Sequence, residues 1–141
     1  MNNHMRNFVI SIGLSAMLGS SAIVAQESAR AIANVPFAFH VKDTNLPAGK
    51  YIVKAVNGAG VIQIADAQTG HSMMVLTQSR DGRNNDSPRL TFQRYGNDYF
   101  LSQVRLPGQQ NGFGLRPGSR EKELAKQPGL VATASVRIQG E

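Results

Sequence analysis

Residues 33–41 read ANVPFAFHV, a stretch in which every second side chain belongs to one apolar set. Successive side chains of an extended strand point to opposite faces, so this set shares a single face. Its members are Ala33, Val35, Phe37, Phe39 and Val41. Pro36 lies on the other face and lacks the N–H of a sheet ladder, which favours an edge or strand-entry position. The stretch therefore predicts a half-buried strand.

Shorter apolar stretches recur along the rest of the chain, separated by the Gly, Asn, Asp and Pro residues typical of turns. They predict strands over residues 50–56, 61–65, 72–77, 90–95, 99–105 and 130–138. Residues 57–60 and 96–98 have the composition of tight hairpin loops. About seven strands at regular spacing predict a mainly β fold, either a small antiparallel sandwich or an open barrel. The expected core includes Phe37, Phe39, Tyr51, Val53, Phe92 and Phe100.

The alternation stops in residues 107–118, which hold four glycines and two prolines. This composition predicts a long loop, and the polar residues 78–88 predict another. Ser119 is a suitable cap for a short helix over residues 120–126, which Pro128 and Gly129 would end. We therefore expect one short helix directly before the last strand.

The first 25 residues have the three parts of a secretory signal. A polar start with Arg6 is followed by an apolar run over residues 8–19 and by small residues up to Ala25. A membrane anchor is the weaker alternative, because residues 8–25 contain four serines and two glycines and barely reach bilayer length. We expect cleavage after Ala25, or else after Ala22. Residues 26–141 would then form a single exported β-domain, periplasmic or extracellular, without a transmembrane segment.

The composition narrows the possible functions. The 141 residues include 15 Lys or Arg and 9 Asp or Glu, which gives a formal net charge of +6. The chain has no cysteine, which excludes disulfides, thiolate metal sites, cysteine nucleophiles and a lipid-modified N-terminal cysteine. The length suits one small domain. These values describe a basic, cysteine-free β-domain.

Five segments of the chain form a recognisable series. They are residues 34–41 (NVPFAFHV), 46–51 (LPAGKY), 89–96 (RLTFQRYG), 99–101 (YFL) and 119–126 (SREKELAK). In this order, they resemble a group of small secreted proteins typical of acidobacterial genomes. The resemblance covers most of the chain after residue 25. It implies a secreted β-fold and supplies no catalytic residue and no cofactor.

Two motifs that could carry chemistry have simpler explanations. Residues 119–122 spell S-x-x-K, but the S-D-N and K-T-G motifs that accompany it in penicillin-recognising enzymes do not occur in the chain. His71, Met73 and Met74 could form a soft metal site, yet adjacent strand residues point to opposite faces. We predict no catalytic, cofactor-binding or metal-ligating residue, and we do not expect an enzyme.

The basic residues suggest a contact surface. Arg80, Arg83, Arg89 and Arg94 lie near aromatic residues, but residues 89–95 do not fit the aromatic signature of RNA-binding domains. Export also removes the usual nucleic-acid partner, so no nucleic acid is expected. The long loop and its flanks are the predicted contact region, for an anionic polysaccharide or an envelope surface. The candidate contact residues are Arg105, Phe113, Leu115, Arg116 and Arg120.

These observations leave two hypotheses open. The first is an exported, non-enzymatic β-domain with a binding or structural role at the cell envelope or outside it. The alternative is a small-ligand carrier or an enzyme whose site forms only in three dimensions. A deep pocket lined by converging polar groups would favour the alternative. For the loop itself, the competing explanation is that Phe113 or Leu115 only pins it to the core.

Overall fold

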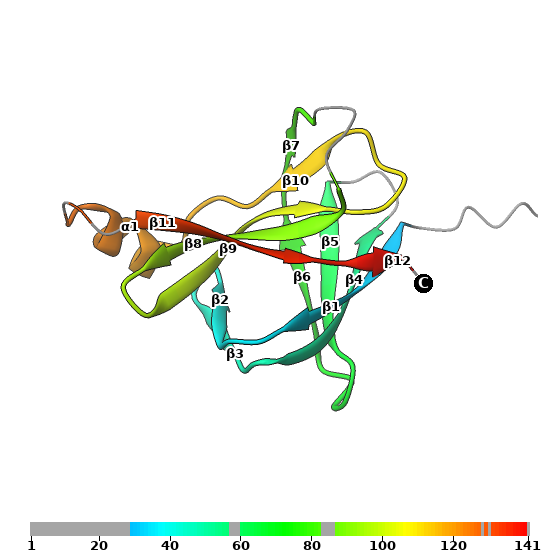
Figure 1. The fold of residues 1–141 in the computed structure, drawn as a ribbon, viewed down its shortest axis with the longest axis horizontal. Coiled ribbons are helices and arrows are strands. Elements are labelled where there is room, and N and C mark those ends of the chain that lie inside the picture. The colour runs from blue at the N-terminus through cyan, green and yellow to red at the C-terminus, as the bar shows by residue number, and fades with distance from the viewer. Residues whose placement is uncertain (1–28, 57–59, 83–86, 128, 130, 141) are drawn as a thin grey trace, which may run out of the picture.

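The described residues form twelve short strands and one helix, arranged in two sheets (Figure 1). The structure is a computed structural model and describes residues 29–56, 60–82, 87–127, 129 and 131–140. The predicted signal segment, its cleavage sites at Ala22 and Ala25, Arg83 and Leu130 lie outside these ranges. The mainly β fold is confirmed. Within the described part of the chain, no helix has the length and hydropathy to cross a membrane.

The first sheet has five strands, all paired antiparallel. Their spatial order is β12 (Gln139–Gly140), β1 (Arg30–Val35), β4 (Gly49–Val56), β5 (Val61–Asp66) and β6 (Ser72–Leu76). The central strands are joined by hairpins, as residues 57–60 and the turn after Asp66 predict. The C-terminal strand β12 pairs with β1, so strands from both ends of the described chain meet at one edge.

The second sheet has seven strands. Its main path is β11 (Val131–Arg137), β8 (Arg89–Tyr95), β9 (Asp98–Arg105), β10 (Gly112–Gly114) and β7 (Gln78–Arg80). Two further strands branch from β9, namely β2 (Phe39–Val41), which pairs parallel with it, and β3 (Thr44–Leu46), which pairs antiparallel with β2. Among the described residues neither sheet closes on itself, so the fold is an open, sandwich-like pair of sheets.

Residues 33–41 form two strands instead of the single strand predicted from their alternation. β1 ends at Val35 and β2 begins at Phe39, and the two strands belong to different sheets. Pro36 follows β1 directly, where its missing N–H can end the ladder. Both Val35 and Phe39 are buried, so the chain passes from one sheet to the other with the predicted face still inward.

The main core lies between the two sheets and combines apolar side chains from both. Phe39 is its centre, with ring contacts to Tyr51 (5.2 Å between centroids) and Phe92 (5.4 Å). Both contacts are edge-to-face, a favoured aromatic geometry. Four of the predicted core residues are buried there, whereas Phe37 is half-buried and stacks on Tyr99 at the margin. The sixth, Phe100, is also buried but lies outside this core cluster.

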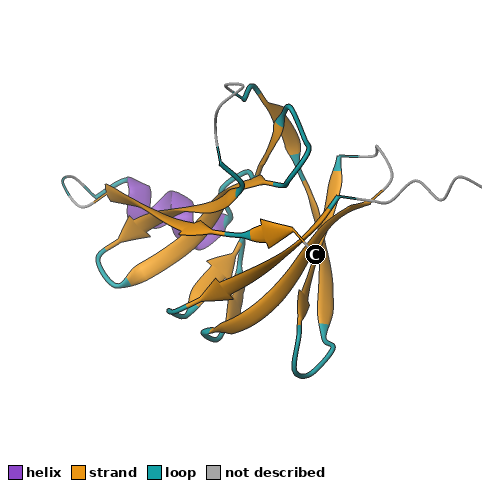
Figure 2. Ribbon diagram, turned by 45° about the vertical axis from the view of Figure 1, so that its right-hand side comes forward, coloured by secondary structure: helices purple, strands orange, loops and turns teal. Residues whose placement is uncertain are grey.

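The helix α1 (Ser119–Ala125) begins one residue earlier than expected, and the prediction that Ser119 caps it is wrong. Gly118 is the N-cap residue, and no side chain of this segment caps the helix. The backbone N–H of Arg120 instead donates to Asp43 Oδ1 (3.3 Å), from the turn between β2 and β3. A Cβ at Gly118 would lie only 2.8 Å from the same oxygen. Glycine is therefore needed for this close approach. Figure 2 shows the helix in purple beside the strands.

Both predicted long loops contain a short strand. Within residues 107–118, β10 pairs with β9 on one side and with β7 on the other. Within residues 78–88, β7 provides the outer partner of β10. The glycines of β10 make room for neighbouring side chains, because a Cβ at Gly112 would lie 2.7 Å from Gln103 Nε2. The glycine-rich composition thus reflects close packing against a strand.

Candidate functional site

The five predicted contact residues have different environments. Arg105 and Leu115 are both 5% exposed, so they present little surface to a partner. Arg105 Nη2 donates to the carbonyl of Gln110 (3.0 Å), and the Leu115 N–H donates to the carbonyl of Ser102 (2.9 Å). Phe113 is half-buried against the core. Leu115 and Phe113 therefore attach the 107–118 segment to the core.

Arg105 is buried beside Gly82, which has no side chain to occupy the same space. A Cβ added at Gly82 would overlap the Arg105 guanidinium. Burial of a guanidinium requires hydrogen-bond partners, and the Gln110 carbonyl is one of them. Arg105 thus holds the 107–118 segment close to β9, so its role is structural.

Arg116 remains exposed and lies beside a second exposed arginine at the edge of the seven-stranded sheet. Gln78 and Arg80 share one face of β7, since they are two residues apart. The Arg80 side chain crosses over Gly114, where a Cβ would lie 2.7 Å from Arg80 Cγ. With its amide in the hydrogen-bonding orientation, the Gln78 side-chain oxygen accepts from Arg116 Nε (2.8 Å) and from Nη2. We call Gln78, Arg80 and Arg116 the arginine patch.

The arginine patch differs electrostatically from the cations of helix α1 and its C-terminal end, which lie beside carboxylates. Arg120 Nη2 lies 3.6 Å from Asp98 Oδ2, and Lys126 Nζ lies 3.1 Å from Glu123 Oε1. Among the described residues, neither Arg80 nor Arg116 forms an ion pair with a carboxylate. A guanidinium presents a planar fork of donors that matches a carboxylate, sulfate or phosphate. The patch can therefore accept an anionic group from outside the chain.

The sequence pointed to only half of this patch. Arg116 was among the predicted contact residues, whereas Arg80 was considered only as one of several loop arginines. The available signals were the two-residue spacing of Gln78 and Arg80 and the equal spacing of Gly112 and Gly114. Those spacings mark two paired strands only when the pairing of β7 with β10 is known.

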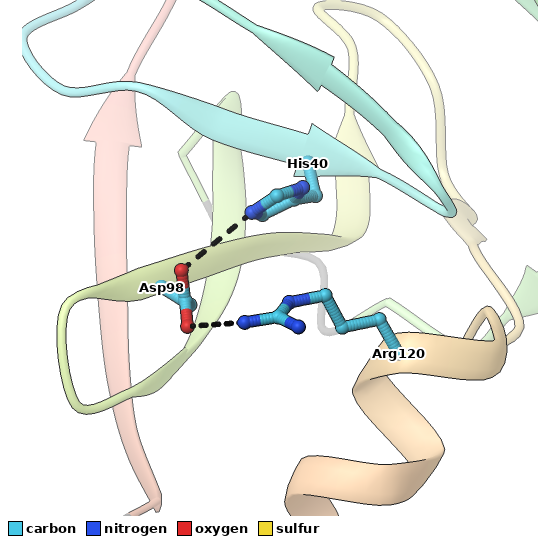
Figure 3. Close-up of polar contacts among 3 residues, drawn as sticks. All are labelled: His40, Asp98 and Arg120. Carbon is cyan, nitrogen blue, oxygen red and sulfur yellow. Dashed lines mark ion pairs between the residues drawn. The ribbon is translucent and has the colours of Figure 1, made fainter.

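A second polar cluster holds the helix to the seven-stranded sheet (Figure 3). Asp98, at the start of β9, lies between two basic side chains: His40 Nε2 is 3.7 Å from its Oδ1, and Arg120 Nη2 is 3.6 Å from its Oδ2. The His40 ring stacks on Phe100, with 4.6 Å between centroids. We call His40, Asp98 and Arg120 the helix clasp, because Asp98 connects both β2 and α1 to β9.

Beneath the helix, Glu121 is only 6% exposed and accepts a hydrogen bond from the Tyr95 hydroxyl (3.3 Å). Burial raises the pKa of the Glu121 carboxyl, and the hydrogen bond from Tyr95 partly opposes that rise. Burial also raises the pKa of Tyr95, and the Glu121 charge adds to the effect. Tyr95 in turn packs edge-to-face on Phe100 at 5.7 Å. Tyr95 therefore connects the buried Phe100 ring to the buried Glu121 carboxyl.

Two sequence motifs remain: the group of His71, Met73 and Met74, and the S-x-x-K motif of residues 119–122. Met73 lies opposite Ile64 and packs against the core, while the adjacent Met74 is 65% exposed, so the two side chains lie on opposite faces. In the part of the chain that the structure describes, no three His, Asp or Glu side chains are grouped to hold a metal ion. Ser119 and Lys122 both lie exposed on α1.

The arginine patch thus combines exposed cations, a glycine that admits a side chain, and an amide that orients one guanidinium. Comparisons with protein-family models, with curated proteins and with solved structures give no match for this chain.

Proposed function

We propose that the chain is an exported, non-enzymatic β-domain that binds an anionic polysaccharide at the cell envelope or outside the cell, through the arginine patch. The observation that carries the proposal is the pair of exposed guanidinium groups of Arg80 and Arg116, which have no carboxylate partner among the described residues. The signal-like features of the first 25 residues and the net charge of +6 support it. So does the resemblance to small secreted proteins.

The local geometry favours binding because both arginines are oriented before a ligand arrives. Arg80 lies across Gly114, and Arg116 is held by Gln78. A side chain that is already ordered loses less conformational entropy on binding. One carboxylate per patch would bind weakly and would be screened by salt. A polysaccharide with many carboxylates offers the patch many equivalent binding positions along one polymer, which raises the apparent affinity by a statistical factor.

The alternative, an enzyme or small-ligand carrier, would have to use a different part of the molecule. The pairing of His40 with Asp98 has the form of a histidine oriented by a carboxylate. Among the described residues, however, His40 forms no hydrogen bond to a serine or threonine. Its partners, Asp98 and Phe100, hold neighbouring strands together. The arginine patch is therefore the better-supported site.

The proposal is tested by binding of the purified protein to polygalacturonate, with neutral dextran as the reference polymer. We expect binding to polygalacturonate only, weakening as salt increases. The double variant Arg80→Gln with Arg116→Gln should raise Kd by at least about tenfold. The matched control, Lys50→Gln with Lys54→Gln, removes the same charge from exposed positions of β4 and should change Kd by less than about twofold.

Three outcomes would contradict the proposal. Equal losses in the two double variants would mean that net charge alone drives binding. Unchanged binding in the arginine variant would place the contact elsewhere on the molecule. Release of new reducing ends from the polymer would show an enzyme.

A further inference from the structure

The strand β6 has a free edge in the described structure, since β5 is the strand that pairs with it. The hydrogen bonds at its two ends fix which residues face that edge. The Asp66 N–H donates to the carbonyl of His71 (2.8 Å), and the Thr77 N–H donates to the carbonyl of Gly60 (2.7 Å). Residues of an antiparallel strand alternate between facing the partner and facing away. The backbone groups that face away belong to Ser72, Met74 and Leu76.

This edge lacks the features that usually prevent strand pairing between molecules. Its sequence, SMMVL, has no charge, no proline and no glycine. Natural edge strands are normally protected by lysine, proline, a bulge or short length. Instead, Met74 is 65% exposed and Leu76 is 71% exposed. An edge of this composition favours addition of another strand.

The strands at the other ends of the two main sheet paths are better protected. The edge strand β7 carries Arg80, and β12 is only two residues long. The strand β11 has its large exposed apolar residue, Val131 (57% exposed), at one end and Arg137 at the other. In β6 the exposed Met74 is instead the central residue.

The exposed apolar surface of β6 continues across the neighbouring strands. Leu76 lies opposite Val61, and Val61 lies opposite Val56 on its other side. Both valines are half-buried. A row of apolar side chains therefore runs from the free edge over β5 to β4. A strand added at the edge would extend this row and bury part of it.

We propose that the strand added at this edge is β6 of a second copy of the chain, paired antiparallel about a two-fold axis at Met74. In that register Met74 faces its equivalent, and Ser72 faces Leu76 of the second copy. All three are residues whose N–H and C=O point outward, so the donors of each strand meet the acceptors of the other. A two-fold contact needs one self-complementary surface, and this edge supplies it. The two five-stranded sheets become one continuous sheet.

The positive charge of the protein does not oppose this contact. The edge is uncharged, and Arg80 follows it in β7 (Figure 1). An antiparallel pairing about Met74 carries the two copies of Arg80 in opposite directions, each roughly 20 Å from the axis. Their separation exceeds the Debye length of about 8 Å in physiological salt. A five-residue strand pair is a small interface, so we expect a weak and concentration-dependent dimer.

Cysteine cross-linking tests the register, because the chain has no other thiol. Directly opposed residues of a hydrogen-bonded antiparallel pair have Cα atoms about 5.5 Å apart, a separation that a disulfide can span. The Met74→Cys variant should therefore form a covalent dimer under mild oxidation. In the Leu76→Cys variant the two thiols would lie roughly 14 Å apart, so it should remain monomeric. Equal cross-linking of both variants, or of neither, would overturn the proposal.

Sedimentation at increasing concentration tests the contact without oxidation. We expect a monomer–dimer equilibrium, which Met74→Lys weakens by at least about tenfold in Kd because two like charges meet at the axis. The control Val131→Lys adds the same charge to the other exposed edge strand and should leave Kd unchanged. A monomer at all concentrations, for instance because the edge takes a foreign peptide, contradicts the proposal. So does open-ended aggregation or an equal effect of the two substitutions.

Discussion

The β8–β9 hairpin buries side chains on both of its faces, and the two faces are built differently. On the inner face, Phe92 and Leu101 pack against the apolar side chains of the five-stranded sheet. On the outer face, the His40 ring stacks on Phe100 and Tyr95 packs edge-to-face on it, and the Tyr95 hydroxyl in turn donates to the buried Glu121 of the helix α1. One face therefore excludes water mainly with apolar side chains, whereas the other also uses ionisable groups.

This difference separates two kinds of stability. Burial of apolar area contributes roughly 25 cal/mol per Å² and depends little on pH or salt. The helix clasp relies on partly exposed ion pairs, each worth about 0–1 kcal/mol and screened by salt. We therefore expect the inner face to hold the fold together and the outer face to position α1, with a sensitivity to pH that the inner face lacks.

The largest effect is expected on the inner face. Phe39→Ala removes the ring that contacts both Tyr51 and Phe92, and it should lower the free energy of unfolding by about 3–5 kcal/mol. Denaturant unfolding of the purified protein measures it. A loss under about 1 kcal/mol would mean that the inner face is not the main source of stability.

Phe100→Ala gives the corresponding test on the outer face. We expect a loss of about 3 kcal/mol, at the lower end of the range for buried phenylalanine, because the partly exposed His40 and Tyr95 rings that contact Phe100 can shift into the space more easily than the side chains of the main core can. The same denaturant titration measures this loss. A loss larger than that of Phe39→Ala would reverse the ranking of the two faces.

Asp98→Asn should have a smaller effect, because it breaks the helix clasp and leaves both hydrophobic clusters intact. Arg120 loses its ionic partner and His40 loses a neighbouring carboxylate, and we expect a loss below about 1 kcal/mol. Measurements in low and high salt provide the control, since the difference from wild type should shrink as salt screens the pairs. A loss independent of salt would argue for packing instead.

The smallest effect concerns Glu121, and its sign depends on pH. Its pKa is raised in the folded state, so at neutral pH the buried, ionised carboxylate opposes folding. As the pH falls through the folded pKa toward the unfolded value, wild type gains stability, fully so below the unfolded pKa. Glu121→Gln should therefore be more stable than wild type at pH 7, with the advantage shrinking near pH 4.

Unfolding at the two pH values measures this change, with Glu123→Gln as the control on the exposed side of the same helix. A constant difference between wild type and Glu121→Gln at both values would show that burial does not control the Glu121 carboxyl.

The inner face was predictable from the sequence, whereas the outer face was not. Alternation identifies one buried face per strand, and it correctly assigned Phe39, Phe92 and Val53 to the core. Phe100 was predicted to be buried, and it is, but on the other side of its strand. Phe100 and its neighbour Leu101 point to opposite faces, and a register shift between Thr91 and Phe92 puts Leu101 and Val104 together on the inner face. Local sequence does not encode that shift.

The helix and the patch depend on contacts between distant segments. Ser119 has the composition of a cap, yet the oxygen that receives the Arg120 N–H comes from Asp43. In the sequence, Gly118 indicates only a flexible loop. The structure shows that Gly118 makes room for Asp43, in the turn between β2 and β3. Likewise, the arginine patch needs β7 beside β10, a pairing of two short strands inside segments that alternation describes as loops.

The position of β1 also sets an order of events for folding. Ala31 pairs with Val53 on one side and with Gly140 on the other, the latter from the opposite end of the described chain. Closing a longer loop costs more chain entropy, so the local hairpins β4–β5 and β8–β9 should form first. Pairing of β12 with β1 then completes the five-stranded sheet last. A chain still being synthesised would hold most of its hairpins and leave one side of β1 unpaired until β12 arrives.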